Sequence, residues 1–169
     1  MIHTFRGARA LALLAIVPLA AACSRTGESA PVSERAASVA TTAAAATGPT
    51  ITVYKSPTCG CCTKWEDHLR ENGFRVESVK REDMAAIKRE QGVPQAMQSC
   101  HTGVVDGYAV EGHVPADVIR KLLAERPAVK GIAVPGMPMG SPGMEGPYKD
   151  DYEVFTFDET GPKDVYAMR

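Results

Sequence analysis

Along most of the chain, segments with the residue pattern of a strand alternate with segments whose apolar residues have the spacing of a helix. Ile51 to Tyr54 are β-branched or aromatic, as in a strand, whereas Trp65 and Leu69 lie four positions apart, as on one helix face. Gly73 follows the helical pattern and supplies a stop signal. The full pattern predicts strands at 51–54, 74–79, 98–105 and 108–110, and helices at 61–72, 83–91 and 115–126.

The predicted elements follow the order β-α-β-α-β-β-α, which is the order of a thioredoxin-like fold. Asp106-Gly107, between the last two of these strands, is a strong hairpin signal. Residues 152–157 and 164–167 have the pattern of two more strands, which we expect to extend the sheet at an edge. The sequence thus predicts an α/β, thioredoxin-like fold: a central mixed sheet of about four to five strands flanked by helices, followed by C-terminal strands.

Residues 131–147 form a loop of another composition, rich in Gly, Pro and Met. Gly and Pro argue against a regular helix or a central strand there. Met137, Met139 and Met144 lie within this loop, and thioether sulfur is a soft ligand that suits Cu(I). Alternatively, the loop folds back over the core and its methionines fill gaps in the packing. Both interpretations stay open at this stage.

The N-terminal end has the pattern of an export signal. Residues 1–23 begin weakly basic and continue with an apolar run that is too short for a comfortable membrane span. The run ends at Ala20-Ala-Ala-Cys23, which resembles a bacterial lipoprotein signal except that Ala20 stands where Leu is usual. We therefore expect lipidation at Cys23, with simple cleavage as the alternative. The destination would be the periplasm or cell envelope of a Gram-negative bacterium, with outer-membrane anchoring through the lipid.

Composition limits what the remaining chain does. Residues 24–49 are rich in Ala, Ser and Thr, and we interpret them as a flexible tether. Residues 50–169 are then one domain, which we expect to be the metal-binding domain. The formal net charge is −1 and no basic stripe is present, so we expect no nucleic-acid partner. Contact with a membrane would be only through the anchor at Cys23.

Three cysteines carry the most specific chemical signal. Cys59, Cys61 and Cys62 follow the first predicted strand and begin the first predicted helix. Free N–H groups and the helix dipole favour anions there, and the thiolate is both the nucleophile and the metal ligand. Cys59 and Cys62 have the spacing of a thiol–disulfide exchange pair, whereas all three sulfurs together suit Cu(I) or Zn(II). Packing as small apolar residues is the third interpretation.

A second segment is expected to complete the site. In a thioredoxin-like fold the chain before the third strand passes beside the first strand–helix junction, which would bring Cys100 to the other cysteines. His101 is adjacent, but neighbours on a strand point to opposite faces, so a supporting role and ligation both stay open. His113 precedes a helix near the expected edge of the site and is a further candidate ligand.

Four motifs together resemble the periplasmic copper-resistance CopG family, which is distinct from the DNA-binding repressor of that name. The match runs from about residue 50 to 160 and rests on Lys55–Cys62, Ser99–Thr102, Glu111–Pro115 and Val134–Met144. The Cys-x-Cys-Cys block is specific in the company of Ser-Cys-His-Thr and weak alone. The resemblance implies a thioredoxin-like fold, copper bound by the cysteines, and a role in handling envelope copper.

Several functions remain in competition. The first is a copper-binding protein that holds Cu(I), with Cu(II) open, at Cys59, Cys61, Cys62 and Cys100, and passes copper to or from other envelope copper-handling proteins. The alternative is a thiol–disulfide oxidoreductase using Cys59 and Cys62, and a version that joins the two couples copper to thiol redox chemistry. Enzymatic activity is therefore left open. A zinc site fits poorly, because adjacent Cys61 and Cys62 depart from the usual ligand spacing.

Overall fold

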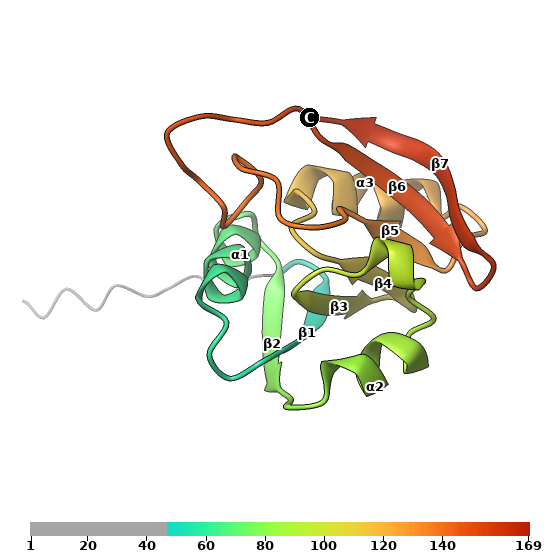
Figure 1. The fold of residues 1–169 in the computed structure, drawn as a ribbon, viewed down its shortest axis with the longest axis horizontal. Helices are drawn as coiled ribbons and strands as arrows, with labels where there is room; N and C mark the ends of the chain where they lie inside the picture. The colour runs from blue at the N-terminus through green and yellow to red at the C-terminus, as the bar shows by residue number, and fades with distance from the viewer. Residues whose placement is uncertain (1–46) are drawn as a thin grey trace, which may run out of the picture. The chain divides into compact units, whose positions relative to one another are not determined.

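A computed structural model describes residues 47–169 of the chain. Within this range it has one seven-stranded mixed sheet, three α-helices and a short 3-10 helix, η1 (Figure 1). The predicted signal peptide over 1–23, the lipidation of Cys23 and all but the last residues of the predicted tether lie outside the described residues. They therefore stay predictions.

The elements agree in kind and order with most of the predicted pattern. The strands are β1 (Thr50–Lys55), β2 (Arg75–Lys80), β3 (His101–Val105), β4 (Tyr108–Glu111), β5 (Gly131–Ala133), β6 (Glu153–Asp158) and β7 (Gly161–Met168). The helices are α1 (Gly60–Glu71), α2 (Met84–Glu90), η1 (Gln95–Met97) and α3 (Ala116–Glu125). Asp106 and Gly107 form the turn between β3 and β4, and both have positive φ, as a tight hairpin turn requires.

The sheet is larger than the sequence predicted. Its order is β2-β1-β3-β4-β5-β6-β7, with parallel pairing in β1–β2 and β4–β5 and antiparallel pairing elsewhere. The mixed α/β class is confirmed, but the count of four to five strands is wrong. The two C-terminal strands do extend one edge, and β5 joins them to β4. Without β5 the two halves of the sheet would not be continuous.

The expectation that Gly and Pro exclude a central strand is wrong at residues 131–133. Gly131 pairs with Ala109 on β4 and with Phe157 on β6, so it lies in the interior of the sheet. A Cβ at Gly131 would collide with the carbonyl oxygen of Ala109 and lie 2.7 Å from the Phe157 ring. Glycine here permits close packing, and Pro135 follows only after the strand has ended.

Apolar residues pack on both faces of the sheet. One cluster joins β1, α1 and α3, and includes Ile51, Trp65 and Ile119, all fully buried. Trp65 also donates a hydrogen bond from its indole Nε1 to the carbonyl oxygen of Val114 at 2.8 Å. A smaller cluster places Met97 of η1 with residues of β4, β5 and β6. The helices thereby fix the strand ends that carry the cysteines and histidines.

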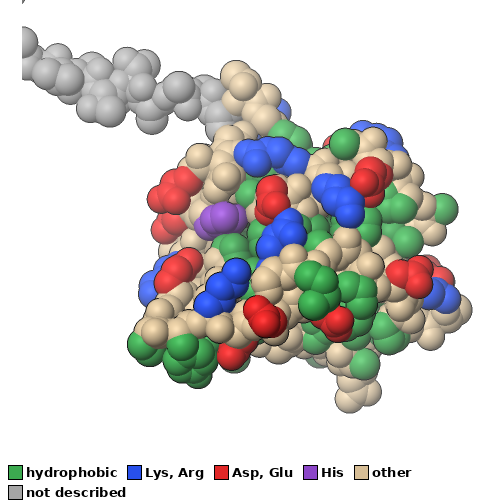
Figure 2. Space-filling model, turned by 90° about the horizontal axis from the view of Figure 1, so that it is seen from above, with side chains coloured by type: hydrophobic (Ala, Val, Ile, Leu, Met, Phe, Trp, Pro, Cys, Tyr) green, Lys and Arg blue, Asp and Glu red, His purple; other side chains and the backbone are tan. Residues whose placement is uncertain are grey.

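The surface shows mixed charge. Figure 2 shows Lys and Arg side chains interspersed with Asp and Glu on the face it displays, and neither sign of charge forms a large patch there. In the described part of the chain, no helix combines the length and the apolar character needed to cross a membrane.

Candidate metal centre

The first three cysteines lie at the end of β1, where the sequence predicted them. Cys59 is the N-cap residue of α1, with extended backbone angles, and Cys61 and Cys62 belong to the first turn of the helix. The first turn has no acidic residue and no side chain caps it. Its free N–H groups and the helix dipole therefore favour negative charge on sulfur at this position.

The cysteine sulfurs are in direct contact with one another. Cys59 and Cys62 form a disulfide, and Cys61 and Cys100 are free thiols. The Sγ atom of Cys61 lies 3.6 Å from that of Cys59 and 3.9 Å from that of Cys100. The four sulfurs all lie within 4.8 Å of one another, so a metal ion would find several of them within reach at once.

Pairing of β1 with β3 explains how Cys100 reaches the other cysteines. The two strands are antiparallel, and Lys55 at the end of β1 faces His101 at the start of β3. Cys100 immediately precedes His101, so it lies beside the end of β1. From that end of β1 the chain continues to Cys59. The predicted meeting of two distant segments is thus present in the structure.

His113 presents a lone pair to the cysteine cluster. Its Nδ1 donates to the carbonyl oxygen of Pro142 at 2.8 Å, which leaves Nε2 unprotonated and 3.1 Å from Cys100 Sγ. A backbone carbonyl that accepts from one ring nitrogen is among the groups that orient a metal-binding histidine. Burial also lowers the pKa of His113, which keeps the ring neutral near pH 7. His113 therefore has the tautomer and the position of a ligand.

His101 lies closer to the cluster than strand alternation suggested. Its Nδ1 is 3.3 Å from Cys100 Sγ, because Cys100 precedes β3 and is not bound by the alternation of the strand. The ring packs against Trp65, with centroids 4.2 Å apart, and burial lowers its pKa well below the usual value. Its Nε2 is the buried side-chain nitrogen or oxygen, among the described residues, that lacks a hydrogen-bond partner.

The Cys100 thiol holds its proton tightly when no metal is present. Burial and the neighbouring Cys61 raise the pKa of Cys100 to about 12. A soft cation that displaces this proton would form the thiolate directly. The protonated thiol can meanwhile donate to Nε2 of His113.

A buried ion pair, which the sequence analysis missed, holds the backbone next to Cys100. Lys88 of α2 contacts Glu111 of β4, and the two side chains are only 6% and 0% exposed. The Glu111 carboxylate also accepts the Ser99 N–H at 2.7 Å and the Thr102 hydroxyl at 2.6 Å. Glu111 therefore fixes the chain on both sides of Cys100. The one signal in the sequence was a lysine on a short, otherwise apolar helix face.

The Gly/Pro/Met-rich loop folds over the site. Figure 1 shows the chain after β5 running to α1 before it returns to β6. Pro142 receives the His113 hydrogen bond, and a Cβ at Gly143 would lie 2.8 Å from the carbonyl oxygen of Cys61. Met137 lines a pocket with Cys100, whereas Met139 contacts Asp150 through its backbone and has its sulfur next to Gly146. The two predicted methionine ligands thus have different surroundings.

Comparison with known proteins agrees with this site. Two solved structures titled "Copper resistance protein copG", Form 1 and Form 2, are each 50% identical to this chain. Each match covers 72% of this chain and 98% of the other, with a TM-score of 0.68. The chain belongs to the CopG family. The resemblance inferred from its motifs is therefore confirmed.

A second comparison covers part of the CopG site. The family described as "Protein of unknown function, DUF411" matches residues 97–144, which contain Cys100, His101, His113 and the methionines of the loop. The turn with Cys59, Cys61 and Cys62 lies outside that match. A search of curated proteins found no match.

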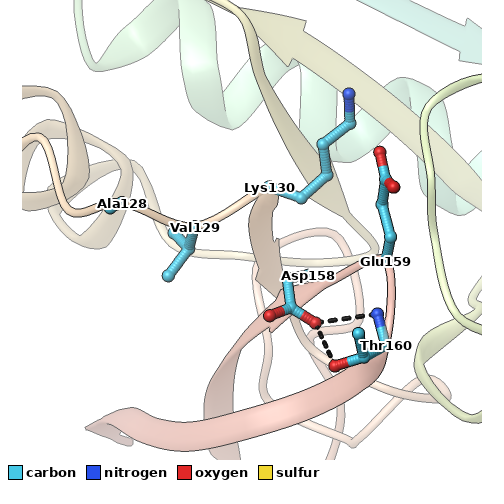
Figure 3. A pocket seen from close by; sticks show the side chains of 6 residues that line it. All are labelled: Ala128, Val129, Lys130, Asp158, Glu159 and Thr160. Carbon is cyan, nitrogen blue, oxygen red and sulfur yellow. Dashed lines mark hydrogen bonds between the residues drawn. The ribbon is translucent and has the colours of Figure 1, made fainter.

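A second pocket of this CopG-family chain, larger than the one lined by Cys100 and Met137, has no soft-metal ligand in its lining. It has a volume of about 450 Å³ and is lined by Ala128, Val129, Lys130, Asp158, Glu159 and Thr160. Figure 3 shows the Asp158 carboxylate accepting hydrogen bonds from the backbone N–H and hydroxyl of Thr160. These bonds stabilise the β6–β7 turn and lower the pKa of Asp158 to about 2. The lining contains neither sulfur nor imidazole, so soft-metal chemistry belongs to the cysteine cluster.

Proposed function

We propose that this CopG-family protein binds Cu(I) in the bacterial cell envelope and serves copper resistance or homeostasis. The ligands are Cys59, Cys61, Cys62 and Cys100, joined by His113. The observation that carries the proposal is that four cysteine sulfurs, from two segments distant in the sequence, lie within 4.8 Å of one another. The titles of the two similar structures, which name copper resistance, support the choice of metal.

The donor set fits copper better than harder metals. Thiolate sulfur selects Cu(I) and zinc, whereas carboxylate and carbonyl oxygens suit Mg²⁺ and Ca²⁺. The sulfur atoms lie close enough to share metal ions, so the site can hold a small cluster rather than a single ion. His113 would add an imidazole, which also tolerates Cu(II). His101 orients the site through its contacts with Cys100 and Trp65, and a ligand role for it is secondary.

The disulfide state would control how many ligands are present. With Cys59 and Cys62 joined, Cys61 and Cys100 remain as thiols beside His113. Reduction would supply two more thiolates. Copper and thiol chemistry can then be coupled: two Cu(II) ions accept one electron each, two thiols become a disulfide, and two protons are released. Loss of the Cu(II) electron paramagnetic resonance signal on mixing with reduced protein is the expected result, and an unchanged signal would count against coupling.

An anaerobic titration tests the copper proposal. Reduced protein with Cys23→Ser, which removes the cysteine outside the described residues, competes for Cu(I) with a chelator of moderate affinity. We expect more than one tightly bound copper per chain, and a sharp fall in a Cys100→Ser variant. Failure to withdraw any Cu(I) from the chelator would reject the proposal.

A second candidate function is thiol–disulfide exchange. The Cys59–Cys62 disulfide at the start of α1 favours it. The thiol of Cys61, only 3.6 Å from Cys59 Sγ, stands against it, because a third thiol invites scrambled pairing. Metal-free protein that shows a defined reduction potential and turns over a disulfide substrate would favour exchange over copper binding.

We also propose the predictions from sequence that concern the fold, the export and the partners of the protein. A thioredoxin-like core is supported by the order β2-β1-β3-β4, in which β3 runs against both of its neighbours. We propose export through residues 1–23, a lipid at Cys23, a tether over 24–49 and a copper-binding domain over 50–169. Partners would be copper ions and other envelope copper-handling proteins. The mass of the mature chain, with and without Cys23→Ala, tests the lipid anchor.

A further inference from the structure

A small pocket leads from the surface to the Cys100 side of the cluster. It has a volume of about 320 Å³ and is lined by Gln98, Ser99, Cys100, Gly136 and Met137. The Met137 side chain is 53% exposed, while Cys100 is partly buried. The pocket therefore has the exposed Met137 and the partly buried Cys100 in one lining. No other lining residue except Cys100 carries a soft donor atom.

The loop that carries Met137 is held in place on both sides. The Ser99 hydroxyl donates to the carbonyl oxygen of Gly136 at 2.5 Å, and His113 Nδ1 donates to that of Pro142 at 2.8 Å. The backbone of Met137 is thus fixed beside the pocket although its side chain is mostly in water. Packing in a core does not explain why a methionine stands at this position, because more than half of Met137 remains exposed.

We propose that Met137 is the first acceptor of Cu(I) and hands the ion to Cys100 through this pocket. The inference rests on the proposed function, because it assigns a route to the same copper site. It separates Met137 from the resident ligands: the thioether would hold the ion in transit, whereas the thiolates would hold it at equilibrium. The substrate class is a Cu(I) complex whose ligands can be exchanged one at a time.

The transfer proceeds by ligand exchange with copper in the +1 state throughout. The bond from Cu(I) to a donor ligand breaks as a bond to Met137 Sδ forms. A bond to Cys100 Sγ then forms while the thiol proton passes to water in the pocket, and the bond to Sδ breaks. A neutral thioether gains and loses copper without a change of its own protonation, so it suits a transient step.

The test separates the rate of copper uptake from the amount. The reduced full chain is mixed anaerobically in a stopped-flow instrument with the coloured Cu(I) complex of bicinchoninate, and the loss of colour is followed. Met137→Leu keeps the size and apolar character of the side chain but removes the sulfur. Met168→Leu is the matched control, because Met168 is 59% exposed and lies on β7.

We expect Met137→Leu to slow uptake by about fivefold or more, a modest change in barrier height, while copper bound per chain at the end is unchanged. Met168→Leu should match the unsubstituted chain in both respects. An unchanged rate in Met137→Leu would overturn the proposal. Loss of bound copper instead of rate would also overturn it, because Met137 would then be a resident ligand. If the unsubstituted chain takes up no copper, the proposed function itself has failed.

A second readout does not depend on copper uptake. The protein is kept oxidised, with the Cys59–Cys62 disulfide intact and with Cys23, Cys61 and Cys100 replaced by serine, so that no thiolate withdraws the probe from the thioether. Its methionine methyl groups are labelled with ¹³C, Ag(I) serves as a redox-inert probe, and Met137→Leu assigns the Met137 resonance. We expect sub-stoichiometric Ag(I) to broaden or shift the Met137 methyl signal and to leave that of Met168 in place. Equal responses of the two signals, or none, would contradict a specific role for Met137.

Discussion

Replacing Lys88 by methionine removes one half of the buried ion pair that supports Cys100. Methionine fills much of the volume of the lysine stem, so the main effect is the loss of the charge next to Glu111. Both side chains are nearly inaccessible to solvent. Removing one partner of such a pair leaves an uncompensated buried charge and typically costs about 3–5 kcal/mol of stability.

The contacts of Glu111 place the expected cost near the lower end of that range. Its carboxylate keeps the hydrogen bonds from Ser99 and Thr102 after Lys88 is lost. Burial already raises the pKa of Glu111, and Lys88 opposes that rise. Without Lys88 the carboxyl can take up a proton, at about 1.4 kcal/mol for each further unit of pKa. We therefore expect Lys88→Met to cost about 3 kcal/mol at pH 7.

The cost should grow with pH, and the sign follows from linkage. A raised pKa means that folded protein keeps the Glu111 proton at a pH where the unfolded chain, with an ordinary value of 4.5, has lost it. Above pH 4.5 the unfolded state therefore binds fewer protons at this group, and the contribution of Glu111 to the free energy of unfolding falls as pH rises. Lys88→Met raises the Glu111 pKa further and extends this fall, so its cost is larger at pH 7.5 than at pH 4.5.

Urea unfolding followed by the fluorescence of Trp65, the single tryptophan, measures this cost. With a slope of about 1–3 kcal/mol per molar urea, the midpoint should fall by about 1–3 M. Arg126→Met is the control, because Arg126 and Asp106 form an exposed pair expected to contribute less than about 1 kcal/mol. The double variant Lys88→Met, Glu111→Gln should recover part of the loss. A cost of Lys88→Met no larger than that of Arg126→Met would refute the reasoning.

Three further predictions follow from the packing and protonation of the site. Gly103→Ala places a Cβ 2.8 Å from Ile51 Cδ1, and such overpacking should cost about 1–3 kcal/mol; an unchanged melting temperature would contradict it. Burial lowers the pKa of His113, so the unfolded chain binds a proton at this group first and the contribution of His113 to stability falls from pH 7 to 5; the cost of His113→Gln should therefore shrink over this range, and a cost independent of pH would count against it. Cys100, with its pKa raised to about 12, should react with iodoacetamide at pH 8 far more slowly than an ordinary peptide cysteine; equal rates by peptide mapping would contradict that burial.

The part of the site that depends on strand pairing could be predicted from sequence. The strand residues before Cys59 and the hairpin signal at Asp106-Gly107 led to an element order in which the third strand was expected beside the first, and the structure pairs β3 antiparallel to β1. Once those strands pair, Cys100 must lie near the first turn of α1. His101 could not be placed in this way, because Cys100 lies one residue before β3 begins and strand alternation does not apply to it.

Other features depend on contacts that no local pattern encodes. Lys88 lies on the otherwise apolar face of a short helix, but only the packing of α2 against β3 and β4 identifies Glu111 as its partner. β5 was missed because the Gly and Pro around it suggest a loop. Its strand conformation comes from pairing with β4 and β6, in which Gly131 allows the backbones to approach.

X-ray absorption at the copper edge of the reduced, Cu(I)-loaded chain tests the central claim most directly. The account predicts that sulfur dominates the atoms bound to copper, and that scattering from a neighbouring copper accompanies loading above one ion per chain. In Cys100→Ser both signals should weaken. Copper bound mainly by nitrogen or oxygen, with no change in Cys100→Ser, would contradict a copper site built from the four cysteines.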